Sequence, residues 1–432
     1  MTQPETSTTE LNRGDIITLD ITRMAHGGRG IGLYDGRVIM ADNAFPGDTV
    51  EVELTKVKKR FAEATTRTLL NAGPLRDTEG TVCAAYEHKA GCCDLSALSE
   101  TGELKIKETV LRDQLERLGG LKNLPPIQIK ALQPTTGWRT RARLGVDEQG
   151  RAGLRKAASN TVIPEITCQQ LSEALTEGVL DEHPKYRFTP GAEVILALDS
   201  DNQRHIVEVK KAARGRRMER VQRVLEGSGT AHQEVLGFDF EVPAAAFWQA
   251  HVEAPAAYSQ IITELLQKYR ADEGTELGDS RSKETLVGWD LYGGVGVFAP
   301  AIARGLGEDH TQIQVVERSH AATRRHQACL DALDVHFLDE AVESGIARLS
   351  APTAVVLDPP RTGAGEKVVK AIAQAHPAHV IHIGCDPATL ARDLKAWTSE
   401  DCGYQLKELH LFNAFPGTHH FETFAYLEPR SS

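Results

Sequence analysis

The chain has 432 residues, and at roughly 150 residues per domain this length predicts two to four domains. Hydrophobic residues make up 41% and charged residues 25%, which is ordinary for globular proteins and excludes wholesale disorder. A formal net charge of -11 excludes a uniformly basic nucleic-acid wrapper but allows a local basic face. Seven cysteines, an odd number, together with a polar N-terminus and no apolar run of membrane-spanning length, predict a cytoplasmic protein without disulfides or membrane contact.

The N-terminal part of the chain has the pattern of a small β-barrel. Residues 1–12 are polar, which predicts a disordered tail. Residues 13–72 alternate apolar and polar side chains in short runs separated by turn motifs, as half-buried strands do. This pattern predicts an OB-like barrel, a fold that often binds single-stranded nucleic acid. Three basic residues at the end of one run are either phosphate contacts or a solvated strand end: Lys58, Lys59 and Arg60.

Residues 73–245 predict a central domain of mixed helices and strands. The clearest helix covers 105–121 and ends in glycines, which favour a helix C-terminus. Two basic runs, 138–156 and 210–223, contrast with the acidic average of the chain and predict contacts with nucleic-acid phosphates, with a solvated face as the alternative. The residues selected from these runs are Arg139, Arg141, Arg143, Arg216 and Arg217.

Residues 246–432 alternate short apolar strands with helices, which predicts a mostly parallel, doubly wound Rossmann-like α/β domain. Asp290 precedes a glycine turn, Gly294-x-Gly296, where the backbone can approach a ligand at a helix N-terminus. Glu317 ends the next strand and can accept hydrogen bonds from both hydroxyls of a ribose. The combination fits NAD or S-adenosylmethionine, and Asp290 with a shortened glycine motif favours S-adenosylmethionine.

Three further strand ends carry chemistry. Asp358 is followed by two prolines and Arg361, and the lack of an aromatic residue at that point argues against an amino-directed adenine methylase. Cys385 stands before a helix whose dipole is expected to lower the thiol pKa, although a buried structural cysteine is the alternative. Glu422 precedes the last strand, where it is either a general base or an ordinary strand-end carboxylate.

The segments DLYGGVG, DPPR, GCDPATLARDL and FPGTHHFE resemble motifs of the S-adenosylmethionine-dependent RNA uridine C5-methyltransferases, in the branch with an N-terminal TRAM domain and a cysteine cluster. The resemblance covers nearly the whole chain. It implies that Cys385 is the nucleophile that adds to C6 of uracil and that Glu422 is the base that removes the C5 proton. The cofactor contacts that the resemblance implies are Gln249, Tyr292, Gly294, Gly296, Glu317 and Asp358.

The same branch carries a [4Fe-4S] cluster on a C-x5-C-x2-C motif and a later cysteine. Cys83 and Cys168 match this pattern, but Cys92 and Cys93 are adjacent, and Ala90 stands where a cysteine is expected. The resemblance thus implies a cluster on these four cysteines, with a degenerate, metal-free site as the alternative. Two smaller departures, Val297 and Asn413, also lie in motifs near the expected active site.

These observations predict an enzyme that methylates C5 of a uridine in 23S ribosomal RNA, because branch members that act on transfer RNA generally lack the TRAM domain. The T-loop of transfer RNA is the alternative substrate. A non-catalytic RNA-binding protein of the same fold is disfavoured by the intact Cys385, Asp358 and Glu422. Cytosine C5-methylation is disfavoured because Arg361 occupies the position after the prolines where those enzymes have a cysteine. We expect a monomer that binds RNA and neither DNA nor membranes.

Overall fold

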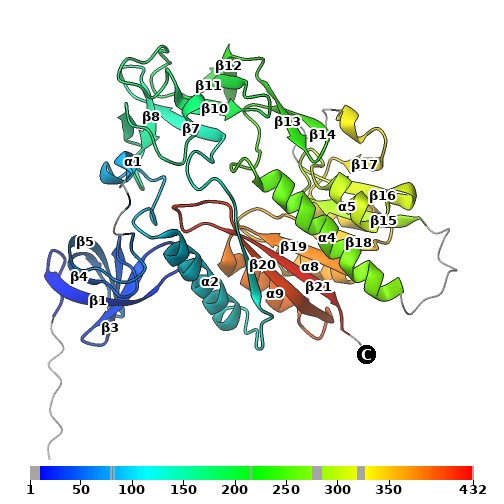
Figure 1. Cartoon of the computed structure of the whole chain (residues 1–432), viewed down its shortest axis with the longest axis horizontal. Helices are drawn as coiled ribbons and strands as arrows, with labels where there is room; N and C mark the ends of the chain where they lie inside the picture. Colours follow the sequence, from blue (N-terminus) through cyan, green and yellow to red (C-terminus); the bar gives the residue numbers. More distant parts are fainter. Residues whose placement is uncertain are drawn as a thin grey trace, which may run out of the picture.

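The structure is a computed structural model in which a small barrel, a central sheet and a larger α/β unit follow one another along the chain (Figure 1). None of the described helices is long and apolar enough to cross a membrane. The described residues are 10–77, 80, 83–214, 217–274, 285–318 and 326–430.

The first five strands close into a barrel in the order β1-β2-β3-β5-β4. The alternating pattern of the sequence explains the closure, because every second side chain, such as Leu19, Val50 and Val52, points into a common apolar core. The OB-like barrel expected from the sequence is confirmed. Its strands are β1 (Ile16–Met24), β2 (Gly30–Tyr34), β3 (Arg37–Asp42), β4 (Thr49–Val57) and β5 (Phe61–Asn71).

The central part of the chain forms an antiparallel sheet in the order β12-β11-β10-β7-β8-β9 and a separate hairpin, β13–β14. The bounds are β7 (Arg141–Val146), β8 (Ala152–Arg155), β9 (Val162–Pro164), β10 (Glu193–Leu198), β11 (Arg204–Arg214), β12 (Arg217–Glu226), β13 (Thr230–Val235) and β14 (Phe238–Pro243), with the short helices α1 (Ala84–Glu87) and α3 (Glu173–Thr176). Cys83, Cys93 and Cys168 are part of the apolar core beneath this sheet.

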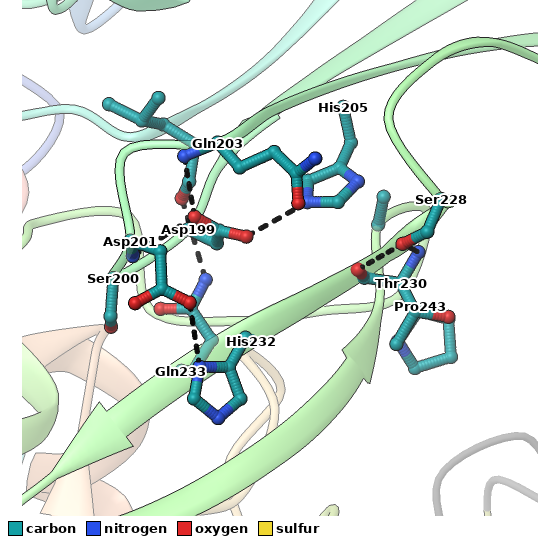
Figure 2. Close-up of polar contacts among 12 residues, drawn as sticks. Asp199, Ser200, Asp201, Gln203, His205, Ser228, Thr230, His232, Gln233 and Pro243 are labelled. Atoms are coloured by element: carbon teal, nitrogen blue, oxygen red, sulfur yellow. Dashed lines mark hydrogen bonds and ion pairs between the residues drawn. The ribbon is translucent and has the colours of Figure 1, made fainter.

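Hydrogen bonds join the central sheet to the β13–β14 hairpin (Figure 2). Asp199 folds the turn after β10 by accepting a hydrogen bond from the backbone N–H of Gln203 at 2.7 Å. Ser200 in the same turn donates its backbone N–H to the carbonyl oxygen of His232 at 2.9 Å, and the His232 ring lies 3.0 Å from the carboxylate of Asp201. The hairpin is therefore fixed to the sheet at the point where the chain passes into the α/β unit.

The α/β unit is built on an eight-stranded sheet in the order β17-β16-β15-β18-β19-β21-β20-β6. The strands are β6 (Ile127–Ala131), β15 (Leu286–Leu291), β16 (Thr311–Val316), β17 (Asp334–Leu338), β18 (Ala354–Leu357), β19 (His379–Gly384), β20 (Tyr404–Asn413) and β21 (Glu422–Pro429). The helices are α2 (Glu100–Arg117), α4 (Ala254–Gly274), α5 (Ala299–Leu306), α7 (Val342–Gly345), α8 (Glu366–Ala373) and α9 (Pro387–Trp397), with 3-10 turns η1 (Glu308–His310), η2 (Ala328–Leu330) and η3 (Ile346–Arg348).

Helices cover both faces of this sheet, as the Rossmann-like prediction requires. Successive residues of β18 show why: Val355 and Leu357 pack with α2, α8 and α9, whereas Val356 packs with α4 and α5. Five neighbouring strands, β17 to β19, are parallel, and β21 runs antiparallel to β19. One strand comes from an unexpected place, since β6 belongs to the segment expected to form the central domain but pairs with β20.

Candidate functional site

The sheet topology brings the chemically interesting residues together at one edge. The chain order reverses between β15 and β18, and ligands of open α/β sheets bind at the carboxyl ends of strands at such a switch point. Asp290 is the last residue but one of β15, Asp358 follows β18 and Cys385 follows β19. Because β21 is antiparallel to β19 and Thr423 pairs with Gly384, the next residues outward, Cys385 and Glu422, lie at the same end of the strand pair.

The glycine turn after β15 adopts the left-handed backbone that its sequence predicts. Gly294 and Gly296 have φ values of 59° and 81°, and Tyr292 has the unusual value of 62° for a residue with a side chain. A Cβ atom on Gly293 would lie 2.6 Å from Cγ of Asp290, so the turn can pack on this carboxylate only without a side chain. Gly294 donates its N–H to Oε2 of Glu317 at 3.2 Å, which joins the two elements expected to hold the cofactor.

Buried carboxyl groups dominate the site. Asp290 is 1% exposed, and neither carboxylate oxygen has a hydrogen-bond partner among the described residues. Burial, with contributions from Asp358 and Glu317, raises the pKa of Asp290 to about 8. Burial also raises the pKa of Asp358 to about 7 and that of Glu422 well above its ordinary value. Such a pocket favours a cationic ligand, because a positive charge would offset the cost of ionising these carboxyls.

The thiol of Cys385 departs from the expectation based on the helix dipole. Burial raises its pKa to about 12, the nearby Glu422 and Asp358 add to the shift, and the positive charge of Arg361 opposes it. The dipole effect is weak because Asp386 already caps the helix: its Oδ1 accepts the N–H groups of Ala388 and Thr389 at 3.0 and 2.9 Å. In the ligand-free protein, the thiol form is therefore favoured.

A buried ion pair on α2 holds the loop that precedes Glu422. Nζ of Lys107 lies 2.6 Å from Oε1 of Glu103 and 2.6 Å from Oδ1 of Asn413. The other oxygen of Glu103 accepts the N–H of Gly417 at 2.9 Å. Sequence reasoning missed Lys107 and Glu103, although a Glu–Lys pair four residues apart on the apolar side of a helix was a usable signal. Asn413, noted as a departure from the family, serves here as the amide acceptor of this pair.

Two more contacts reach the catalytic loops from other parts of the chain. Asp94, directly after Cys93, accepts the backbone N–H of His419 at 2.8 Å and pairs with its ring. His26, in the loop between β1 and β2 of the barrel, lies 3.0 Å from Oδ2 of Asp386. The cysteine segment and the barrel thus both contact residues beside Glu422 or Cys385, and neither contact was expected from the sequence.

The structure brings the four candidate metal-binding cysteines to one place. The Sγ atoms of Cys83, Cys93 and Cys168 lie within 4.8 Å of one another, and Cys92 Sγ is 3.5 Å from Cys93 Sγ. All four are free thiols, and the backbone N–H of Gln169 points to Cys83 Sγ at 3.4 Å, as N–H groups do toward metal thiolates. These sulfur atoms fit a metal centre with thiolate ligands: Cys83, Cys93 and Cys168 lie close together, and Cys92 lies beside Cys93.

The candidate RNA contacts divide into exposed and buried groups. Lys58, Lys59 and Arg60 are exposed at the turn between β4 and β5, and Arg143 is exposed and paired with Glu193 at 2.8 Å. Arg216 lies outside the described residues, and the structure describes only the backbone of Arg217, in β12.

Arg141 was wrongly selected as an RNA contact. Its side chain is buried and donates to the carbonyl oxygens of Ala246 and Ala244 at 2.9 and 3.2 Å. Burial lowers the pKa of its guanidinium to about 10. It therefore fastens the segment after β14 to the central sheet. Arg139 is partly buried as well, with Nε donating to the Arg141 carbonyl at 2.9 Å.

Gln249 lies in this same fastened segment, between β14 and α4, and is partly exposed. Phe247, two residues earlier, is 81% exposed, which is unusual for a phenylalanine and leaves its ring free to stack on a base.

Comparisons with known proteins agree with this geometry. The family profile described as tRNA (Uracil-5-)-methyltransferase matches residues 347–430, and the TRAM domain profile matches residues 10–66. A Corynebacterium glutamicum protein described as an uncharacterized RNA methyltransferase is 49% identical and covers 97% of this chain and 98% of its own. The 23S rRNA (uracil(1939)-C(5))-methyltransferase RlmD of Methylococcus capsulatus is 29% identical and covers 95% of this chain and 97% of its own.

A solved structure shares the fold over the whole length. The Pyrococcus abyssi tRNA (uracil-54, C5)-methyltransferase in complex with S-adenosyl-L-homocysteine covers 95% of this chain and 100% of its own, with a TM-score of 0.67 and 19% identity.

Proposed function

Since this chain belongs to the family of S-adenosylmethionine-dependent RNA uracil C5-methyltransferases, we propose that it methylates C5 of a uridine in 23S ribosomal RNA through a covalent adduct between Cys385 and C6 of uracil. The observation that supports the proposal is the β19–β21 register, in which Cys385 and Glu422 lie at one end of the strand pair, while Asp358 follows the neighbouring strand β18. Ribosomal RNA is favoured over transfer RNA by the two RlmD relatives, which are named for 23S rRNA and each cover 95% of this chain.

The proposed roles follow from the chemistry of uracil. C5 is a weak nucleophile until a thiolate adds to C6, which places negative charge on C5 and O4. Bound S-adenosylmethionine supplies the methyl group as an electrophilic sulfonium. The Cys385 thiolate forms the S–C6 bond. C5 then takes the methyl group while the methyl–sulfur bond of the sulfonium breaks and the neutral thioether leaves, and Glu422 accepts the proton that leaves C5. The electrons of the C5–H bond re-form the C5–C6 double bond, and the Cys385 thiolate departs.

The buried carboxylates are proposed to prepare the site for the sulfonium. Asp290, Asp358 and Glu422 each resist ionisation in the ligand-free pocket. A cationic ligand next to them stabilises their charged forms, and its positive charge also favours the thiolate of Cys385, so the pKa of this thiol falls toward the range where a thiolate forms. Gly294, Gly296 and Tyr292 would carry the ligand on the turn after β15, with Glu317 at its ribose, and Gln249 is proposed as a further cofactor contact.

We propose that Cys83, Cys92, Cys93 and Cys168 hold a [4Fe-4S] cluster. Methyl transfer requires no metal, so the cluster would act in folding by tying the segment before Asp94 to the central sheet. A reducing cytoplasm, where free thiols persist, is the proposed place of action.

We propose that RNA contacts the exposed turn 58–60 and the exposed ring of Phe247. The protein would bind as a monomer to a single strand of RNA, and the target base would leave its stack to reach the site.

Incubation with S-adenosylmethionine carrying a tritiated methyl group tests the function on two substrates, undermodified ribosomal RNA and transfer RNA. We expect 5-methyluridine in ribosomal RNA, no product with Cys385→Ala, and a covalent protein–RNA adduct that survives denaturant with Glu422→Gln. Cys402→Ala, which changes a partly buried thiol outside the site, is the matched control and should retain full turnover. Product only in transfer RNA would overturn the substrate, and full activity of Cys385→Ala would overturn the mechanism.

A further inference from the structure

One buried hydroxyl group at the site has no bonding partner. Tyr258 on α4 is 0% exposed, and its Oη has no hydrogen-bond partner among the described residues. Leaving a buried hydroxyl unbonded costs stability, so a chain that gained nothing from it would do better with phenylalanine. Such a group is expected where its partner changes its charge state during a reaction.

The aromatic contacts of Tyr258 locate it over the proposed base. Its ring centroid is 5.3 Å from that of Phe412 and 5.0 Å from that of Phe424. Phe412 is the cross-strand partner of Glu422 in the β20–β21 pair, and Phe424 is two residues further along β21. Side chains directly opposite and side chains two apart project from the same face of a sheet, so Tyr258 packs on the face that carries Glu422.

Glu422 is the natural partner of this hydroxyl. Its Oε2 is also buried without a hydrogen-bond partner among the described residues, so a donor and an acceptor lie unbonded on one face of the sheet. Burial raises the pKa of the Tyr258 phenol, and Glu422, Asp358 and Cys385 add to the shift, so the phenol stays protonated, as a donor must be. Arg361 is the positive charge that acts on Glu422 and opposes the rise of its pKa.

We propose that Tyr258 is a positioning residue for the base: its hydroxyl donates a hydrogen bond to the Glu422 carboxylate when that group ionises, and so orients it toward C5 of the uracil. The inference rests on the proposed function. A hydrogen bond to the charged form stabilises that form, so Tyr258 makes Glu422 a usable base at neutral pH in spite of its burial. The bond would be loose in the ligand-free protein and close when RNA and cofactor fill the pocket.

The test uses Tyr258→Phe, which removes the oxygen and keeps the ring on Phe412 and Phe424. With RNA tritiated at C5 of uridine, tritium release reports proton removal from C5. We expect release to slow about 10- to 100-fold at neutral pH, because one hydrogen bond to a charged group is lost. We also expect the acid limb of the pH profile to move up by about one to two units, the KM for RNA to stay unchanged, and the covalent adduct to accumulate as it does with Glu422→Gln.

A matched control separates this role from ordinary packing. Tyr404→Phe removes another buried hydroxyl of the same unit, one that is bonded to the Pro377 carbonyl at 2.7 Å. Tyr404→Phe should lower Tm and leave the pH profile in place, whereas Tyr258→Phe should keep or raise Tm. Unchanged tritium release in Tyr258→Phe, or a loss that is equal at every pH and accompanied by a lower Tm, overturns the inference. Absence of tritium release in the wild-type protein instead overturns the proposed function on which the inference rests.

Discussion

Replacing Asp290 by asparagine should stabilise the ligand-free protein more and more as the pH rises. The folded state raises the pKa of Asp290 from 3.8 to about 8, so it holds the proton more tightly than the unfolded chain does. The stability due to this proton is fully present below pH 3.8 and is lost as pH rises toward 8. Asparagine has nearly the same shape and carries no proton to lose, so the variant escapes this loss.

The magnitude follows from the size of the shift. At pH 7 the unfolded chain has passed the ordinary pKa of 3.8 by about three units, while folded Asp290 is still mostly protonated. At ~1.4 kcal/mol per unit, the wild-type protein has lost about 4 kcal/mol from this group, and Asp290→Asn should be more stable by that order at neutral pH. Near pH 4 the two proteins should have nearly the same free energy of unfolding, because a neutral carboxyl and an amide destabilise the folded state by similar amounts when they are buried without hydrogen-bond partners.

Urea unfolding at several pH values from about 5 to about 8, combined with amide hydrogen exchange in β15 and β18, measures the difference. The difference in the free energy of unfolding between Asp290→Asn and the wild type should increase by ~1.4 kcal/mol per pH unit. Asp309→Asn, at an exposed position of the same unit, is the control and should show no such trend. Saturating S-adenosylmethionine should narrow the gap, since a cation near Asp290 favours its charged form. A gap that stays constant with pH would refute the reasoning.

Three further predictions concern the other contacts of the site. Arg141→Met should lower the free energy of unfolding by about 1–3 kcal/mol or more, measured by thermal unfolding, and leave the Kd for RNA unchanged. Lys58→Ala should instead weaken RNA binding and reduce the number of ions released on binding by about one, without changing Tm. The opposite pattern would show that Arg141 contacts RNA after all. Cys83→Ser should remove iron and the visible absorbance from anaerobically purified protein, and equal iron in both proteins would exclude the proposed ligand. Asp94→Ala, which frees His419, should reduce kcat about 10- to 100-fold with little change in KM for S-adenosylmethionine, and unchanged kcat would show that the loop is held without it.

The local pattern of the sequence predicted the barrel, the parallel strands and the helices on both faces. These features depend on side-chain periodicity within about ten residues and on turn chemistry, which a sequence states directly. The edge at which Asp290, Asp358 and Cys385 meet was also predictable, because each residue ends a strand and the carboxyl ends of parallel strands share one edge. The clustering of the cysteines in the central domain came from the resemblance, and the structure agrees with it.

Contacts between segments far apart in the chain could not be predicted from the sequence. Strand β6 joins a sheet whose other strands start more than 150 residues later, and Lys107 bonds Asn413 from a helix 306 positions away. Arg141 looked like its basic neighbours, but its role depends on three carbonyl groups near residue 245 that only folding brings to it.

The sequence by itself determined the kinds of element, the positions of the reactive groups at strand ends and the chemistry those groups can perform. The tertiary structure decided the protonation of these groups and their hydrogen-bond partners. The thiol of Cys385 has a raised pKa because burial and two carboxylates outweigh a helix terminus that Asp386 already caps. Tyr258 packs on the face of the sheet that carries Glu422 because β20 and β21 pair Phe412 with Glu422. Charge and hydrogen bonding act through space over a few ångströms, so they depend on which residues the fold makes neighbours, whatever their separation along the chain.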